Sequence, residues 1–176
     1  IKILEHEGVE YIFGIPGAKV DSIFDALGDS KIKMILCRHE QNACFMAAAY
    51  GRLTGHPGVV LVTSGPGVGN LCTGLLTATT EGDPVVAIGA NVPRDMLYKS
   101  SHQSAKNEKI LEGVTKLSKE IYSEHIVSES LAEAFRVAKA PKEGACFLSF
   151  PQDVLLSETS GDVVRNSHVE FHSHAS

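Results

Sequence analysis

Two short segments of this chain hold residue types that could do chemistry. Residues 63–70 read Thr-Ser-Gly-Pro-Gly-Val-Gly-Asn and lie between a predicted strand and a predicted helix. Glycines in such a loop allow the backbone to approach a ligand closely. The second segment is centred on Glu40, which follows another predicted strand at the start of an Ala-rich helix. If the strands are parallel, both segments border the crevice where open α/β sheets bind ligands.

Each segment taken alone also has a purely structural interpretation. A carboxylate in a first helical turn is favoured simply by the positive end of the helix dipole. The glycine loop could be an ordinary turn. It is not a dinucleotide fingerprint, because Asn70 stands where the third glycine of G-x-G-x-x-G would fall, and no P-loop lysine follows.

The elements that would position these segments alternate along the chain. Short apolar runs predict strands, and longer patterns of period 3.6 predict helices. The expected strands are 11–13, 33–37, 59–63, 85–88 and 145–150, and the expected helices end at 6 or cover 20–27, 41–53, 71–80 and 128–140. This order predicts an α/β fold, a three-layer sandwich with a central parallel sheet flanked by helices. The strand at 33–37 is mostly apolar and suited to burial on both faces.

The domain is expected to cover residues 1–156, with 157–176 forming a polar linker or tail that leads to an absent central domain. Residues 91–112 form a long polar connection of the kind that often carries function. Three histidines, His168, His172 and His174, could bind a metal ion adventitiously, but no carboxylate or cysteine is grouped with them, so we expect a frayed tail and no metal site.

Composition excludes several classes of function. The formal net charge is -5 and no basic run is present, which argues against a nucleic-acid partner. No apolar stretch is long enough to span a membrane, and the first residues lack the order of a signal peptide, so we expect a soluble cytoplasmic protein. The four cysteines have no CxxC spacing and sit among apolar or small residues, which favours buried free thiols.

Six segments, in this order, resemble the N-terminal domain of acetolactate synthases. They are 13–18 (FGIPGA), 38–43 (RHEQNA), 51–55 (GRLTG), 63–67 (TSGPG), 81–85 (EGDPV) and 150–154 (FPQDV). The resemblance runs from the first residues to about Val164, and His102-Gln103-Ser104 is similar to the catabolic, FAD-independent branch. The family resembled here holds the aminopyrimidine ring of thiamine diphosphate on this domain, across a dimer interface.

The resemblance implies roles for particular residues. Glu40 matches the glutamate that shares a proton with the ring nitrogen N1′, which activates the cofactor. Pro66, Gly67 and Asn70 match positions lining the pyrimidine pocket, and a second loop matches the segment beside the reactive carbon: Ile15, Pro16, Gly17 and Ala18. Gln103 matches a glutamine near the substrate. Lys19 could attract the carboxylate of pyruvate, or be a solvent-exposed lysine with no such role.

The implied activity is condensation of two pyruvates into 2-acetolactate with loss of CO2, in a homodimer or tetramer that needs no FAD. The family holds Mg²⁺ and the diphosphate on a second domain with a Gly-Asp-Gly motif, which this sequence does not contain, so we expect the chain alone to be inactive. Two alternatives stay open. One is the same domain of another thiamine enzyme, such as pyruvate oxidase, a carboligase or a decarboxylase. The other is a stand-alone, non-catalytic binding module.

Overall fold

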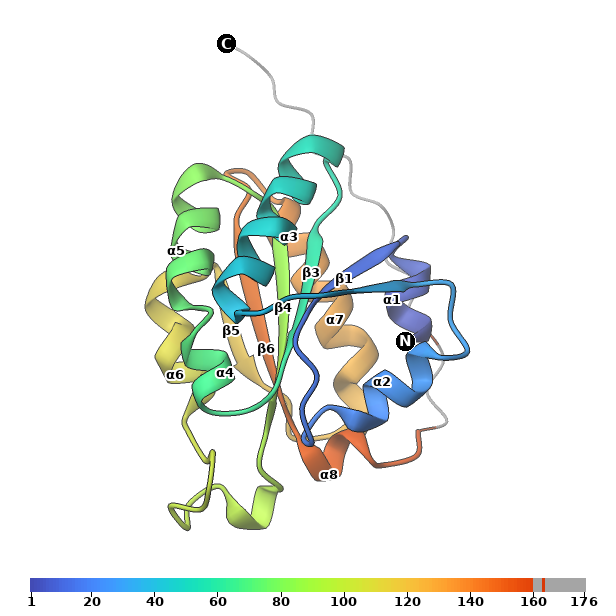
Figure 1. Cartoon of the computed structure of the whole chain (residues 1–176), viewed down its shortest axis with the longest axis vertical. Helices are drawn as coiled ribbons and strands as arrows, with labels where there is room; N and C mark the ends of the chain where they lie inside the picture. The colour runs from blue at the N-terminus through green and yellow to red at the C-terminus, as the bar shows by residue number, and fades with distance from the viewer. Residues whose placement is uncertain (160–162, 164–176) are drawn as a thin grey trace.

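The computed structural model describes residues 1–159 and residue 163, in which strands and helices alternate along the chain (Figure 1). The strands are β1 (Tyr11–Gly14), β2 (Lys33–Leu36), β3 (Gly58–Val62), β4 (Val85–Asn91), β5 (Leu117–Glu120) and β6 (Ala145–Pro151). The α-helices are α1 (Lys2–His6), α2 (Asp21–Leu27), α3 (Glu40–Thr54), α4 (Pro66–Gly69), α5 (Cys72–Glu81), α6 (Asn107–Leu111), α7 (Val127–Lys139) and α8 (Gln152–Leu155). Three 3-10 turns, Arg94–Met96, Glu112–Val114 and Glu124–Ile126, complete the elements.

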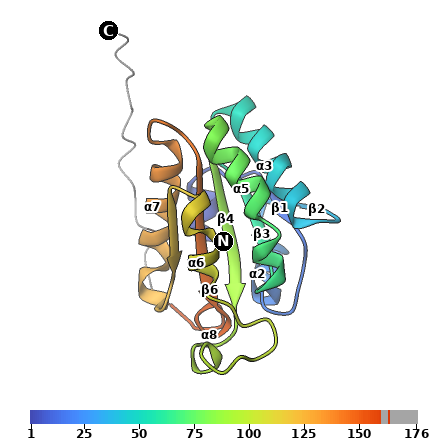
Figure 2. The same ribbon diagram turned by 90° about the vertical axis from the view of Figure 1, so that its left-hand side faces the viewer.

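The strands form one sheet in the order β2-β1-β3-β4-β6-β5, and every neighbouring pair is parallel. Helices cover both faces, with α7 on one side of the sheet and α3 and α5 on the other (Figure 2). The predicted three-layer α/β sandwich is therefore confirmed. Within the described residues, no helix is both long and apolar enough to cross a membrane.

The two layers of the core follow from the alternation of side chains along the central strands. In β3, Val59 and Leu61 face the layer of α1, α2 and α7, whereas Val60 and Val62 face the layer of α3 and α5. Every residue of β3, β4 and β6 is buried. Strands covered on both faces need apolar residues at consecutive positions, which explains their uninterrupted runs of valine, alanine and phenylalanine.

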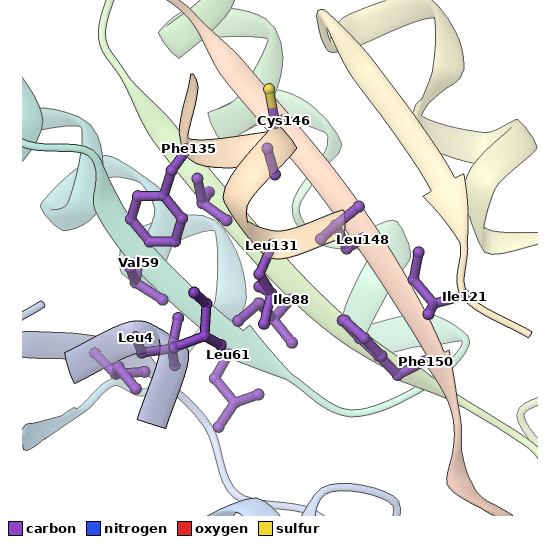
Figure 3. Close-up of a cluster of buried hydrophobic side chains, with 14 of the residues drawn as sticks. Leu4, Val59, Leu61, Ile88, Ile121, Leu131, Phe135, Cys146, Leu148 and Phe150 are labelled. Atoms are coloured by element: carbon purple, nitrogen blue, oxygen red, sulfur yellow. The ribbon is translucent and has the colours of Figure 1, made fainter. Parts of the chain in front are cut away.

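The larger layer gathers aliphatic and aromatic side chains from four strands and three helices (Figure 3). Leu131 and Phe135 of α7 lie one helical turn apart and pack toward Ile88 and Leu148 of the sheet. The small residues on α3 have the complementary function, because Ala43, Ala47 and Ala48 allow this helix to lie close against the opposite face. Because α3 lies close to the sheet, its first residue, Glu40, is near the carboxyl end of the sheet.

Two expectations about strands were wrong. β2 is an edge strand, and its outer residue Leu36 is 69% exposed, so the apolar run at 33–37 is not buried on both faces. β5 was missed because its sequence, Leu-Ser-Lys-Glu, has no apolar run; it lies at the other edge, where one face needs little cover.

The four cysteines are free thiols, but only two of them are buried. Cys44 and Cys146 lie in the core, whereas Cys37 and Cys72 are partly exposed, so the expectation of burial holds for half of the set. The tail histidines His168, His172 and His174 lie outside the described residues, and the predicted boundary at 156 stays a prediction.

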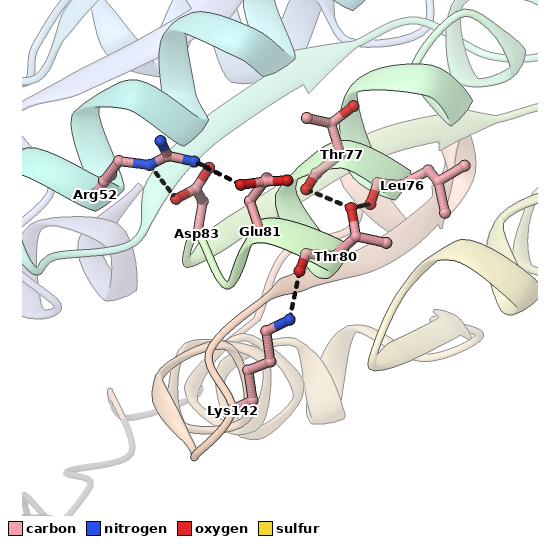
Figure 4. Close-up of polar contacts among 7 residues, drawn as sticks. All are labelled: Arg52, Leu76, Thr77, Thr80, Glu81, Asp83 and Lys142. Carbon is pink, nitrogen blue, oxygen red and sulfur yellow. Dashed lines mark hydrogen bonds and ion pairs between the residues drawn. The ribbon is translucent and has the colours of Figure 1, made fainter.

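Two of the six recognised segments meet at the amino end of β4, where an ion pair joins them (Figure 4). Arg52 of α3 donates from Nε to Asp83 Oδ1 at 2.7 Å and from Nη2 to Oδ2 at 3.0 Å. Asp83 is buried, and Glu81 adds a longer contact to Arg52 at 3.7 Å. This cluster lies at the end of the sheet opposite to Glu40, so it is separate from the predicted site.

Candidate functional site

The predicted site residues all follow the carboxyl ends of strands. Residues 15–19 follow β1, Glu40 comes shortly after β2, residues 63–70 follow β3, and Gln103 lies in the connection after β4. Gln152, which was not predicted, follows β6. Since all strands are parallel, these segments lie together at the end of the sheet that holds the carboxyl ends of the strands. The topology therefore brings five separate parts of the sequence to one end of the molecule.

Glu40 is the first residue of α3 and is half-buried. His39 caps this helix, because its Nδ1 accepts from the backbone N–H of Gln41 at 3.1 Å. The Glu40 carboxylate accepts a hydrogen bond from Asn70 Nδ2 at 2.9 Å. Its other oxygen, Oε1, lies 3.3 Å from the point where a Cβ on Gly67 would be. The side chain therefore points at the 66–70 segment rather than away from it.

The glycine loop is a sharp turn followed by one short turn of helix. Gly65 has φ +59° and ψ -110°, a conformation that only glycine adopts readily, and Pro66 then starts α4. Gly65 also lies against the backbone of Gln103: a Cβ there would be 2.8 Å from the Gln103 carbonyl oxygen. The Ser64 hydroxyl donates to Gln103 Oε1 at 3.3 Å, so the loop after β3 and the loop after β4 touch at this point.

Thr63 joins the glycine loop to the loop after β1. Its Cβ would lie 2.7 Å from a Cβ on Gly17, and its Cγ2 3.1 Å from one on Gly67. The side chain therefore fills the space that both glycines leave open. Neither Thr63 nor Ser64 was predicted as a site residue, although both precede the glycines in the recognised segment.

Gln152, at the start of α8, holds the loop after β1. Its Oε1 accepts from Lys19 Nζ at 3.2 Å, and its Nε2 donates to the carbonyl of Ala18 at 3.1 Å. In the described part of the chain, no hydrogen bond or ion pair joins Lys19 to Glu40 or Gln103. Gln152 was also missed as a site residue, and its place in the recognised segment 150–154 was the available signal.

The next residue, Asp153, holds the start of the connection after β4. Its carboxylate accepts from the Arg94 backbone N–H at 3.0 Å and from Arg94 Nε at 2.6 Å. Arg94 also donates from Nη1 to the carbonyl of Tyr122 at 2.7 Å. Partial burial alone would raise the pKa of Asp153, but the bonds from Arg94 outweigh it and hold this pKa below its ordinary value. α8 thus ties two loops of the site to the sheet.

This arrangement fits a flat, nitrogen-containing ring. Glu40 supplies a carboxyl group that can accept or hold a proton, and Asn70 fixes the orientation of that carboxyl group. Because Gly67 has no side chain, its backbone can lie close to Oε1 and to Thr63 Cγ2. Among the described residues, no group of three His, Cys, Asp or Glu side chains lies close enough to hold a metal ion.

Comparison with known proteins identifies relatives of this chain. The chain is 54% identical over 165 residues to the acetolactate synthase of Bacillus subtilis and 49% identical over 161 residues to the catabolic acetolactate synthase of Raoultella terrigena. The acetolactate synthase large subunit of Mycobacterium tuberculosis is 41% identical over 156 residues. These alignments cover 94%, 92% and 88% of this chain but 29%, 29% and 25% of the relatives, so the chain spans less than a third of their length.

The family assignment rests on a continuous match. Residues 1–110 match the family described as thiamine pyrophosphate enzyme, N-terminal TPP binding domain. This region contains Glu40, the glycine loop, Thr63 and Gln103, which are the residues that the fold brings together. The chain belongs to the thiamine pyrophosphate enzyme family and is its N-terminal, TPP-binding domain.

Proposed function

We propose that this chain is the pyrimidine-binding part of a thiamine diphosphate-dependent acetolactate synthase of the catabolic type, which condenses two pyruvates into 2-acetolactate with loss of CO2. The observation that carries the proposal is the placement of the Glu40 carboxylate, 2.9 Å from Asn70 Nδ2 and against the backbone of Gly67. The similarity to proteins named acetolactate synthase supports the choice of reaction.

In this proposal Glu40 is the catalytic residue of the domain. Thiamine diphosphate, when bound, would supply a nucleophilic thiazolium carbon. Glu40 shares a proton with the ring nitrogen N1′ and so holds the aminopyrimidine in its reactive form. Asn70 keeps the carboxyl group turned toward the ring, and the half-burial of Glu40 limits competition from water.

The other residues of the site position the ring and the substrate. Pro66 and Gly67 form one wall of the pyrimidine pocket, because the turn that they begin lies against the Glu40 carboxylate. The loop of Ile15, Pro16, Gly17 and Ala18, fixed by Thr63 and Gln152, lies beside the reactive carbon. Gln103 contacts the substrate, and Lys19 attracts its carboxylate from its place next to Gln152.

The complete enzyme requires parts beyond this chain. Mg²⁺ and the diphosphate are held by another domain, FAD is not needed, and the chain alone is inactive. Exposed apolar side chains at the end of β2 and along α3 support assembly as a homodimer or tetramer: Leu36 is 69% exposed, Met46 42% and Leu53 85%. Cys37 Sγ lies 3.8 Å from Met46 Sδ, so the end of β2 and the outer side of α3 form one continuous surface.

The test is acetolactate formation from pyruvate by the full-length protein with thiamine diphosphate and Mg²⁺ and without added FAD. We expect the wild type to be active and Glu40→Gln to lose at least about 100-fold in kcat, because a positioned proton donor contributes roughly 10²- to 10⁴-fold. Glu10→Gln is the matched control, since Glu10 is exposed and precedes β1 at the opposite end of the sheet. A Glu40→Gln enzyme as active as Glu10→Gln would refute the proposal.

A further inference from the structure

We propose that Asn91 is a positioning residue for Gln103: its side-chain amide holds the base of the 92–106 connection and so fixes the glutamine against the glycine loop. This inference rests on the proposed function, in which Gln103 meets the substrate. Asn91 is the last residue of β4 and is 1% exposed. Nothing in the sequence around it, Gly-Ala-Asn-Val-Pro, marks it as functional.

The first observation is the crossing of hydrogen bonds at the base of this connection. Asn91 Nδ2 donates to the carbonyl of Ala105 at 3.0 Å. In the reverse direction, Asn107 Nδ2 donates to the carbonyl of Ala90 at 2.9 Å. Both amide side chains are buried; the bond from Asn107 is buried, and the bond from Asn91 is partly buried. The two ends of the connection are therefore tied together next to the sheet.

The second observation is that Asn91 is itself held in one orientation. Its Oδ1 accepts from the backbone N–H of Val92 at 2.9 Å, which fixes Nδ2 on the other side. Nδ2 also lies 3.2 and 3.3 Å from the two oxygens of Glu120, at the end of β5. Glu120 pairs in register with Ser149, whose hydroxyl accepts from Asn107 at 3.1 Å. The two buried amides thus belong to one polar network.

The third observation is that packing alone does not support the connection. A cavity of about 190 Å³ lies beneath it, lined by Asn91, Leu97, Tyr98, Ala105, Glu120 and Tyr122, among others. Tyr98 is 83% exposed, and the hydroxyls of Ser101 and Ser104 bond to carbonyls within the same connection. Because a cavity lies on one side of the connection and solvent on the other, its position depends on a few hydrogen bonds.

Those hydrogen bonds matter for Gln103 because its backbone conformation is strained. Gln103 has φ +63°, which is uncommon for a residue with a side chain, and its backbone lies against Gly65. The Ser64 hydroxyl meets its side chain at 3.3 Å. Ala105, the residue that Asn91 holds, is only two positions away. Losing that bond releases the segment that keeps Gln103 in this conformation.

A pair of variants isolates the bond from Asn91 to Ala105. In Glu120→Gln, Asn91 can still donate both to Ala105 and to the new amide oxygen. In Asn91→Asp combined with Glu120→Gln, the contact between the two side chains survives with reversed polarity, and the wild-type net charge is kept. Only this double variant lacks a donor for the Ala105 carbonyl. The two proteins differ by one amide replaced with a carboxylate.

The primary measurement is hydrogen–deuterium exchange of the full-length protein, followed in peptides covering 97–106, with peptides of β3 as an internal reference. We expect exchange in 97–106 to be about five- to tenfold faster in the double variant than in Glu120→Gln, as expected for one lost buried hydrogen bond. Exchange in β3 should be the same in both. Equal exchange in 97–106, or faster exchange spread over β3 as well, would overturn the proposal.

Kinetics give the second readout. We expect kcat/KM for pyruvate to fall about tenfold in the double variant relative to Glu120→Gln, as misplacement of a substrate contact produces. Exchange of the cofactor C2 proton should stay within about twofold, because Glu40 is untouched. A parallel loss of both would show a general structural defect and overturn the positioning role. If the wild type forms no acetolactate, the proposed function fails, and the exchange comparison still decides the position of the connection.

Discussion

Replacing Gly65 with alanine should destabilise the domain through two separate effects. Gly65 has φ +59° and ψ -110°, a backbone conformation that costs a residue with a Cβ about 1–3 kcal/mol. A Cβ would also stand 2.8 Å from the carbonyl oxygen and 3.0 Å from the Cα of Gln103. Backbone atoms cannot move aside as a flexible side chain can, so overpacking adds about 1–3 kcal/mol. We expect Gly65→Ala to lose roughly 2–6 kcal/mol of unfolding free energy.

Two other glycines separate these effects. Gly55, the C-cap of α3, has φ +72° but no atom within 4 Å of the position that a Cβ would take, so Gly55→Ala should cost only the backbone strain, about 1–2 kcal/mol. Gly69 ends α4 with open space around it and no positive φ, so Gly69→Ala should be neutral or stabilise by up to about 1 kcal/mol. The excess of Gly65→Ala over Gly55→Ala therefore contains the contact with Gln103, together with the additional strain of the Gly65 backbone conformation.

The assay is urea unfolding of the 176-residue chain followed by circular dichroism, with unfolding free energies compared at equal denaturant slopes. The reasoning predicts the order Gly69→Ala, Gly55→Ala, Gly65→Ala, from most to least stable. If Gly65→Ala were within about 0.5 kcal/mol of Gly55→Ala, the close approach of the two loops would be wrong. The placement of Gln103 beside the glycine loop would then fall with it.

Three further predictions concern the core and the buried acid. Burial raises the pKa of Glu120 to about 7, although hydrogen bonds from Ser149 and Asn91 act to lower it. Because the folded state favours the protonated group, the free energy of unfolding should fall as pH rises from about 4.5 to 7 and be lowest above pH 7. Glu120→Gln should remove this pH dependence, and at about pH 8 it should be more stable than the wild type by up to roughly 3 kcal/mol. If urea unfolding of the variant kept the wild-type pH dependence, Glu120 would not be its source. Phe147→Ala should lose about 3–5 kcal/mol, because Phe147 is fully buried in the layer of α3 and α5, and a loss under about 1 kcal/mol would contradict that burial. Burial raises the pKa of both Cys44 and Cys146 to about 12, so iodoacetamide at about pH 8 should label these thiols only after unfolding. The partly exposed Cys72 should react in the native state. Equal labelling rates for the three thiols would contradict this prediction.

Much of the fold could be predicted from the sequence because its central strands are covered on both faces. Uninterrupted apolar runs such as the one in β3 are typical of strands buried in this way, and five of the six strands were found. β5 escaped because Lys119 and Glu120 gave no apolar signal. The position of β2 at an edge depends on strand order, which the composition of a single strand does not contain.

The candidate site was predictable to a lesser degree. The rule that parallel strands place their carboxyl ends together was enough to predict that Glu40 and the glycine loop lie at the same end of the sheet. The same rule could not find Thr63, Gln152 or Asn91, because their importance depends on contacts between loops far apart in the sequence. Such contacts depend on side-chain geometry, which a pattern of residue types does not specify.

The central claim is that the Glu40 carboxyl group activates a cofactor bound beside the 66–70 segment. The most direct test is the rate of C2 proton exchange in thiamine diphosphate bound to the full-length protein, compared between wild type and Glu40→Gln at saturating cofactor. The account predicts that exchange slows by at least about 100-fold in the variant while the cofactor still binds. An unchanged exchange rate with cofactor bound would contradict it.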